Sequence, residues 1–203
     1  MKRYDVRRVP ESGVDWSAAE VLTDFSFPWE ARAAPKTEFR ALWDDGHLHF
    51  RFDCIDDDLV LGDGATSKER VLGSDRAEIF LAPDLTLNPY FSFEMEPRGE
   101  VLAYRAQHYR QIDWSWRCDA LQIHSRIDAD RYSVQGALPL KTLREMNVLK
   151  GDARQFFAGV YRAEFSHQAD GSIHQGWMPW VNPHTESPDF HVPASFGVFH
   201  LVG

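Results

Sequence analysis

The segment HLHFRFDC, residues 47–54, alternates without a break between polar and apolar side chains. Its even-numbered residues (Leu48, Phe50, Phe52, Cys54) are apolar, and its odd-numbered residues are histidine, arginine or aspartate. Successive side chains of a β-strand point to opposite faces of the sheet. The segment therefore predicts a strand with one buried and one solvent-facing side.

The chain on either side of this segment continues the β pattern. Residues 37–43 predict a preceding strand, and Asp44-Asp45-Gly46 is a hairpin turn with a strong Asp-Gly signal. Further strands are predicted at residues 76–81, 90–96, 100–106, 120–127, 131–138, 155–165 and 196–202. One short helix is predicted at residues 139–146, where a proline precedes leucines and a methionine at helical spacing.

Many short strands separated by turn signals are typical of an all-β fold. We predict an antiparallel β-sandwich, jelly-roll-like or immunoglobulin-like, with one short helix. No repeat and no change of composition divides the 203 residues, so residues 1–203 are expected to form a single domain.

Composition limits the classes of function. The chain is 43% hydrophobic and 13% aromatic, which is enough for a packed core. Its net charge is −9, from 31 acidic and 22 basic residues. This balance argues against a nucleic-acid partner and against an anionic membrane partner.

The N-terminus and the two cysteines bear on the compartment. No apolar secretory segment and no membrane-spanning segment is evident, so the sequence as written predicts a soluble cytoplasmic protein. An extracellular or periplasmic location would require a leader that has been removed. Cys54 and Cys118 are expected to be two separate thiols, with one disulfide as the alternative.

Two tryptophans near the C-terminus lie among prolines. Trp177 and Trp180 flank Pro179, and Pro183 follows. Proline fixes φ and removes a backbone donor, so we interpret this run as a loop outside the sheet. Loops on a rigid scaffold often carry binding groups. Flat indole rings there suit a ligand with a flat apolar face and polar edges, such as a sugar.

Four motifs in order resemble family 9 carbohydrate-binding modules. They are residues 37–52, residues 74–84 with the pattern D-x-x-E-I-F-L-x-P, residues 90–99, and a closing W-x-x-P…P-x-x-F-G pattern at residues 177–197. The resemblance runs from about residue 14 to the end of the chain. It implies a β-sandwich of the wider DOMON-like group that binds a mono- or oligosaccharide, often at a glycan chain end. Such modules need no cofactor, although some contain structural calcium.

The resemblance also implies site residues. Glu78 matches an acidic residue that contacts sugar hydroxyls, Arg162 lies where a polar contact is placed, and Trp177 or Trp180 matches a stacking tryptophan. The family's second clamp tryptophan has no counterpart, because residues 70–75 contain no aromatic side chain. A two-sided clamp would then need Trp114 or Trp116, which would share one face if they lie on a strand.

Other interpretations of the same residues remain open. Each candidate residue could serve packing or ion pairing, as Trp43 is expected to, and the domain would then be a scaffold or interaction domain. Residues 56–58 could offer oxygen ligands to calcium, although a solvated acidic turn is favoured. His47 and His49 share a strand face, but the spacing shows no third metal ligand.

Two chemically active alternatives are less favoured. A haem-binding domain could use Met95 or Met178 as a ligand, but the spacing supports no such pair. A glycosidase needs two carboxylates facing each other across a cleft, which sequence cannot place. No catalytic motif is present, so we predict a non-catalytic protein.

Overall fold

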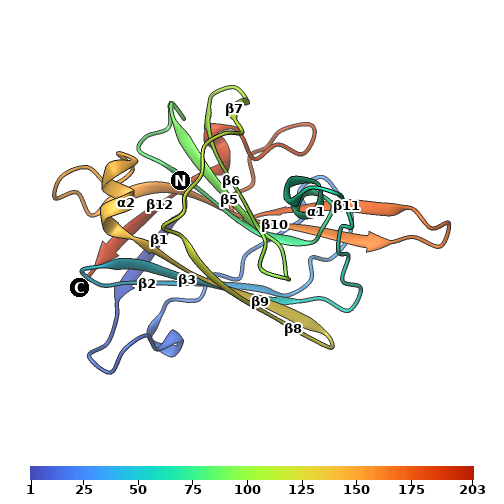
Figure 1. The fold of residues 1–203 in the computed structure, drawn as a ribbon, viewed down its shortest axis with the longest axis horizontal. Coiled ribbons are helices and arrows are strands. Elements are labelled where there is room, and N and C mark those ends of the chain that lie inside the picture. Colours follow the sequence, from blue (N-terminus) through green and yellow to red (C-terminus); the bar gives the residue numbers. More distant parts are fainter.

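The computed structural model describes residues 1–203 as one curled sheet of twelve strands (Figure 1). The order along the sheet is β7-β6-β5-β4-β10-β12-β1-β2-β3-β9-β8, and β11 pairs with β10 beside this path. The strands are β1 (Arg3–Arg8), β2 (Thr37–Trp43), β3 (His47–Ile55), β4 (Arg76–Ala82), β5 (Tyr90–Met95), β6 (Val101–Gln107), β7 (Gln111–Asp113), β8 (Gln122–Asp128), β9 (Arg131–Pro139), β10 (Gln155–His167), β11 (Ile173–Pro179) and β12 (Gly197–Val202).

The sheet is mixed, so the prediction of a purely antiparallel sheet was wrong. The exception is β1, which runs parallel to both β12 and β2. Every other pairing is antiparallel. Parallel neighbours need a long connection, and here one connection spans almost the entire chain between β1 and β12.

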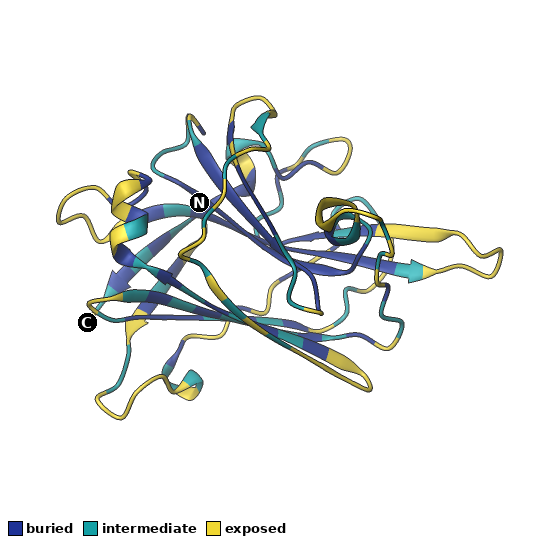
Figure 2. Cartoon of the chain, in the orientation of Figure 1, coloured by how far each residue is buried: buried dark blue, intermediate teal, exposed yellow.

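The two halves of the curled sheet face each other across the main core (Figure 2). This core joins Phe39, Phe50 and Phe52 of one half to Ile79 and Phe93 of the other. A smaller cluster, which includes Phe80, Tyr104 and Tyr161, lies on the opposite face of β4, β6 and β10. Strands β4, β5 and β10 are therefore buried on both faces, whereas β3 alternates between buried and half-buried residues as its sequence predicts.

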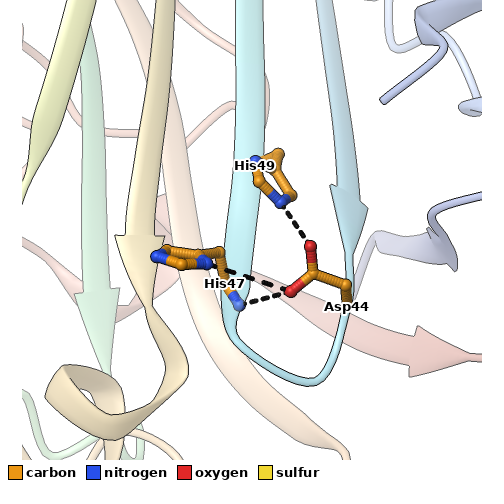
Figure 3. Close-up of side chains that lie close together, drawn as sticks. All are labelled: Asp44, His47 and His49. Atoms are coloured by element: carbon orange, nitrogen blue, oxygen red, sulfur yellow. Dashed lines mark hydrogen bonds and ion pairs between the residues drawn. The ribbon is translucent and has the colours of Figure 1, made fainter. Parts of the chain in front are cut away.

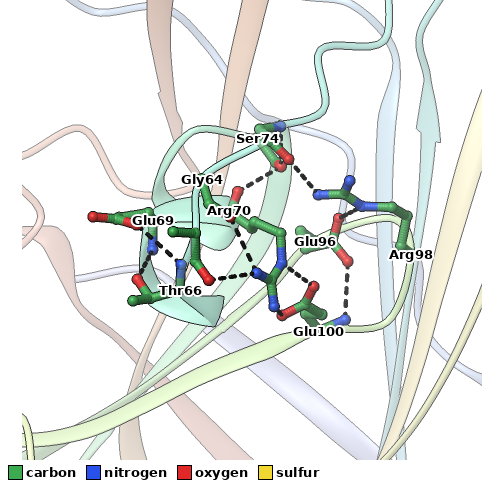
Figure 4. Close-up of polar contacts among 10 residues, drawn as sticks. Gly64, Thr66, Glu69, Arg70, Ser74, Glu96, Arg98 and Glu100 are labelled. Atoms are coloured by element: carbon green, nitrogen blue, oxygen red, sulfur yellow. Dashed lines mark hydrogen bonds and ion pairs between the residues drawn. The ribbon is translucent and has the colours of Figure 1, made fainter.

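Two short helices accompany the strands. Helix α2 (Leu140–Glu145) confirms the predicted helix, but α1 (Ser67–Leu72) was not predicted. Thr66 and Glu69 form a capping box at the start of α1. Arg70 then binds Glu100 through two hydrogen bonds of 2.6 and 2.9 Å, which joins α1 to the turn between β5 and β6 (Figure 4).

Several smaller predictions can be compared with the structure. Cys54 and Cys118 are free thiols, as expected, and Trp43 is buried in the main core. Two 3-10 turns, η1 (Trp16–Ala18) and η2 (Pro193–Ser195), complete the elements. None of the helices has the length and apolar character needed to cross a membrane.

Candidate functional site

A pocket of ≈ 440 Å³ opens on the face of β4, β5 and β6 that points away from the main core. It combines polar side chains of the sheet with aromatic side chains from β11, from the end of β7 and from the segment before η2. The lining residues are Leu72, Arg76, Glu78, Glu94, Tyr104, Arg110, Ile112, Trp114, Trp177, Pro188, Asp189, Phe190 and His191.

The floor of the pocket is a buried hydrogen-bonded network. Arg76 Nε lies 2.9 Å from Glu78 Oε1 and 2.8 Å from Glu94 Oε2. The Tyr104 hydroxyl donates to Glu94 Oε1 at 2.9 Å. Because Glu78 and Glu94 are directly paired across β4 and β5, their side chains share one face. One guanidinium therefore lies between two neighbouring carboxyl groups.

The charge state of this floor follows from its burial. Burial, and after it the nearby Glu94 carboxylate, raises the pKa of Glu78 to about 8. Burial therefore favours the neutral form of Glu78, and its buried Oε1 lies beside Arg76 Nε without a well-directed hydrogen bond. A neutral carboxyl group has both a donor and an acceptor, so Glu78 can take part in hydrogen bonds of either kind.

His191 forms a neutral part of the wall. Burial lowers the pKa of His191 to about 4, so its imidazole is uncharged at pH 7. Its Nδ1 lies 2.6 Å from the Tyr90 hydroxyl, and its ring stacks on Tyr104. Nearby, Arg110 binds Asp189 at 2.9 Å, and the Tyr109 hydroxyl donates to the same carboxylate at 2.6 Å.

Trp177 forms one aromatic wall. It lies on the edge strand β11, opposite Ala163 of β10, and is half-buried. Its ring contacts Phe165 and Phe190 edge-on at centroid distances of 5.7 and 5.9 Å. The predicted loop is thus partly wrong: the strand continues to Pro179, which is tolerated because β11 has no partner on its other side.

Trp114 forms a second aromatic wall. It follows β7, is 38% exposed, and packs on Tyr104 with ring centroids 4.9 Å apart. Lys68 of α1 places its Nζ 3.4 Å from the centre of the indole. Since α1 is fixed to the β5–β6 turn by Arg70 and Glu100 (Figure 4), the helix supports this wall of the pocket.

Three predicted site residues, Trp180, Trp116 and Arg162, lie outside this pocket. Trp180 is only 3% exposed and belongs to the main core, where it packs against Phe199. Its ring lies outside the pocket that Trp177 lines. Trp116 does not share a face with Trp114, because the chain turns after β7. It packs instead on Phe91, on the other face of the sheet, with a centroid distance of 5.1 Å.

Arg162 is the third predicted site residue that lies outside the pocket. Its side chain is fully buried on the face of β10 opposite to the pocket, because neighbouring strand residues alternate. It donates to Thr37 Oγ1 at 3.0 Å and to Asp56 Oδ2 at 3.2 Å, and it also pairs with Glu164. These contacts are structural.

The Arg162 cluster also bears on calcium. Asp56, Asp75 and Glu164 lie close enough together to hold an ion. However, the Arg162 guanidinium already lies against Asp56 and Glu164, and both Asp75 oxygens accept backbone N–H groups of Val60 and Phe165. Calcium takes six to eight oxygen ligands, so the residues of this cluster do not fit it.

Several pocket residues were missed by sequence reasoning. Arg76 and Glu94 lie at two-residue spacing from Glu78 and Ser92 within otherwise apolar strands. Polar residues at every second position of an otherwise apolar strand share one face of the sheet, so this pattern predicts a buried polar site on that face. Arg110, Asp189 and His191 come from loops and had no such signal.

Two indole walls stand above a polar floor, an arrangement that suits a small ligand with a flat apolar face and polar edges. The sequence agrees with this interpretation. Residues 13–203 match the model of the family described as "Carbohydrate family 9 binding domain-like", and the chain belongs to that family. None of the curated proteins matches it in sequence.

Solved structures show the same fold. A candidate carbohydrate-binding protein from Bacteroides uniformis is 16% identical, with a TM-score of 0.79 over 99% of both chains. A family 9 carbohydrate-binding module from Caldicellulosiruptor kristjanssonii in complex with cellotriose is 15% identical, with a TM-score of 0.63 over 100% of this chain and 94% of that one. The glucose complex is 17% identical, with a TM-score of 0.59 over 100% and 96%.

Proposed function

We propose that this domain binds a mono- or oligosaccharide without catalysing its conversion, and that a sugar ring occupies the pocket between Trp114 and Trp177. The observation that carries the proposal is that these two tryptophans, distant in sequence, line one pocket with the Arg76–Glu78–Glu94–Tyr104 network as its floor. Membership of the family and the sugar complexes of its solved members support this assignment.

The pocket suits a neutral sugar. Its volume of ≈ 440 Å³ lies within the range of small-ligand sites, about 300–1,000 Å³. The two arginines that line the pocket, Arg76 and Arg110, are each paired with carboxylates, which favours a neutral ligand over an acidic one. The protonated Glu78 can donate to one sugar oxygen, while the indoles cover the apolar face of the ring.

The expected affinity is modest. Each aromatic contact contributes about 0.5–1.5 kcal/mol beyond area burial, and each net hydrogen bond about 0.5–1.5 kcal/mol. After the cost of association, two stacked rings and three hydrogen bonds leave about −4 kcal/mol, which corresponds to a roughly millimolar Kd. Such affinity suits a module that gains avidity from an attached partner.

The carboxylates argue against a glycosidase. The two catalytic groups of such an enzyme act on either side of the scissile bond. Glu78 and Glu94 instead come from adjacent strands, point from the same face and contact the same Arg76 Nε. Release of reducing ends from a polysaccharide by the pure protein would overturn the non-catalytic assignment.

A scaffold without sugar affinity is the second candidate, and calorimetry separates the two. Wild-type protein is titrated with glucose and cellotriose, and the titration is repeated with Trp177→Ala. The matched control is Trp116→Ala, which removes a tryptophan from the other face of the sheet. We expect binding in the wild type and the control and a large loss in Trp177→Ala. A folded wild type that binds neither glucose nor cellotriose, and no member of a wider panel of glycans, would favour the scaffold.

The remaining assignments are also proposals. We propose that the curled sheet is a β-sandwich of the DOMON-like group. The sugar pocket needs no cofactor, and a structural calcium stays a prediction that thermal unfolding with added calcium or EDTA would test. We propose no nucleic-acid or membrane partner, in keeping with the net charge of −9. A secreted location would suit a polysaccharide ligand.

A further inference from the structure

The hairpin between β2 and β3 brings together three metal-ligating side chains that lie apart from the sugar pocket (Figure 3). His47 and His49 are two residues apart on β3 and share one face, as the strand period requires. Asp44 comes from the turn that precedes β3, and its carboxylate points toward both imidazoles. The spacing of the histidines alone gave no third ligand, and the folded hairpin supplies it.

We propose that Asp44, His47 and His49 bind a divalent transition-metal ion of the zinc class. His49 Nε2 lies 2.8 Å from Asp44 Oδ2, and His47 Nδ1 lies 4.0 Å from Asp44 Oδ1. One ligand atom from each residue can be chosen so that all three lie within 4.8 Å of one another. Ligand atoms about 2.0–2.2 Å from a tetrahedral zinc ion are separated by roughly 3.3–3.5 Å. Small side-chain rotations therefore complete the geometry.

The turn holds the carboxylate in place for this role. Asp44 Oδ1 accepts hydrogen bonds from the backbone N–H groups of Gly46 and His47, both at 2.7 Å. These bonds fix the rotamer of Asp44 and leave Oδ2 directed at His49. Hydrogen bonds that orient a metal ligand strengthen a site, because less freedom is lost on binding. A metal ion bound to both atoms would replace the direct contact between Asp44 Oδ2 and His49 Nε2.

The surroundings leave the ion accessible. The side chains of His47, Asp44 and His49 are 41%, 38% and 16% exposed. His49 also borders a hollow of ≈ 330 Å³ on the outer face of β3, β8 and β9. A water molecule or another donor can therefore fill the fourth position, which keeps the site open.

The donor set selects the class of metal. Two imidazole nitrogens and one carboxylate oxygen favour zinc and its neighbours over calcium or magnesium, which prefer oxygen ligands. The buried Asp56, Asp75 and Glu164 cluster has no nitrogen donor and already surrounds a guanidinium. The hairpin is thus the better transition-metal site of the two.

The test is calorimetric titration of chelator-treated protein with Zn²⁺, together with Co²⁺ as a spectroscopic probe. We expect one saturable site per chain in the wild type and visible Co²⁺ absorption typical of a low coordination number. Both signals should be lost in His47→Gln and in His49→Gln. Asp44→Asn is the sharpest variant, because its amide oxygen can keep the two turn hydrogen bonds while the anionic ligand is removed.

A matched control is available elsewhere on the surface. His167 Nδ1 lies 2.8 Å from Asp58 Oδ1, so it forms a similar His–Asp pair without a second histidine. His167→Gln should keep the full Zn²⁺ isotherm. The proposal is overturned if the wild type shows no saturable Zn²⁺ binding. It is also overturned if His47→Gln, His49→Gln or Asp44→Asn binds Zn²⁺ as the wild type does while circular dichroism shows a native fold.

Discussion

Replacing Trp114 by alanine tests the second aromatic wall of the pocket. Residues 70–75, where the resemblance places a second clamp tryptophan, contain no aromatic side chain, so Trp114 is the residue that we propose in its place. In the structure the indole is 38% exposed, rests on Tyr104 and lies under the Lys68 ammonium. The part of the indole that neither Tyr104 nor Lys68 covers is the face that we expect a sugar to contact. Trp114→Ala removes that face without opening a cavity in the main core.

The magnitude follows from the contacts. The stacking contribution of about 0.5–1.5 kcal/mol corresponds to a loss of affinity of about 2- to 12-fold, and lost apolar area adds to it. The aromatic pair with Tyr104 and the exposed cation–π contact with Lys68 together contribute about 1–2.5 kcal/mol to folding. The variant should stay folded but unfold at lower urea concentration.

The assay is calorimetric titration with glucose and cellotriose, with urea unfolding measured on the same samples. Trp114→Phe should recover part of the affinity, because a smaller ring still stacks. Trp116→Ala should bind as the wild type does, because its side chain packs on Phe91 on the other face. If Trp114→Ala is folded and binds sugar with unchanged affinity, the two-wall reasoning is refuted.

Three further predictions concern buried groups. The pKa of Glu78 is raised from 4.5 to about 8, so the stability given by its neutral form is complete below about pH 4.5 and is lost as the pH rises through 8. Glu78→Gln should therefore flatten the dependence of the unfolding free energy on pH in that window, and an unchanged slope would contradict this. Arg162→Met leaves Asp56 and Glu164 without their cation and should cost about 3–5 kcal/mol in urea unfolding. A loss of less than 1 kcal/mol would argue against the structural role. Trp180→Ala should also cost about 3–5 kcal/mol, because it opens a cavity beside Phe199. Sugar affinity in the folded fraction should not change, and a folded variant with lost affinity would return Trp180 to the site.

Much of the fold could be predicted because burial and periodicity coincide. Strand β3 shows its alternation clearly, since one face contacts the main core and the other is solvated. Strand β1 was missed, because its six residues pair with the far end of the chain and no local signal reveals that contact. Helix α1 was also missed, although Thr66 and Glu69 carry a capping-box signature.

The site was harder to predict, because its residues depend on which face each side chain takes. Side chains alternate between the two faces of β10, so Arg162 and its neighbour Tyr161 point to opposite sides of the sheet. The alternation alone does not identify the face that carries the pocket. Trp177 and Trp180 also have different surroundings. Trp177 lies on β11 and lines the pocket, whereas Trp180 follows Pro179 and is buried in the main core. Trp114 and Trp116 diverge because the strand ends at Asp113.

The central claim is that a sugar lies between Trp114 and Trp177. Its most direct test is the ¹H–¹⁵N spectrum of the seven tryptophan indoles during titration with cellotriose, assigned by single Trp→Phe variants. We expect the indole signals of Trp114 and Trp177 to move in a saturable way, while those of Trp116 and Trp180 stay in place. Saturable binding that leaves both Trp114 and Trp177 unmoved would contradict the account and place the ligand elsewhere on the sheet.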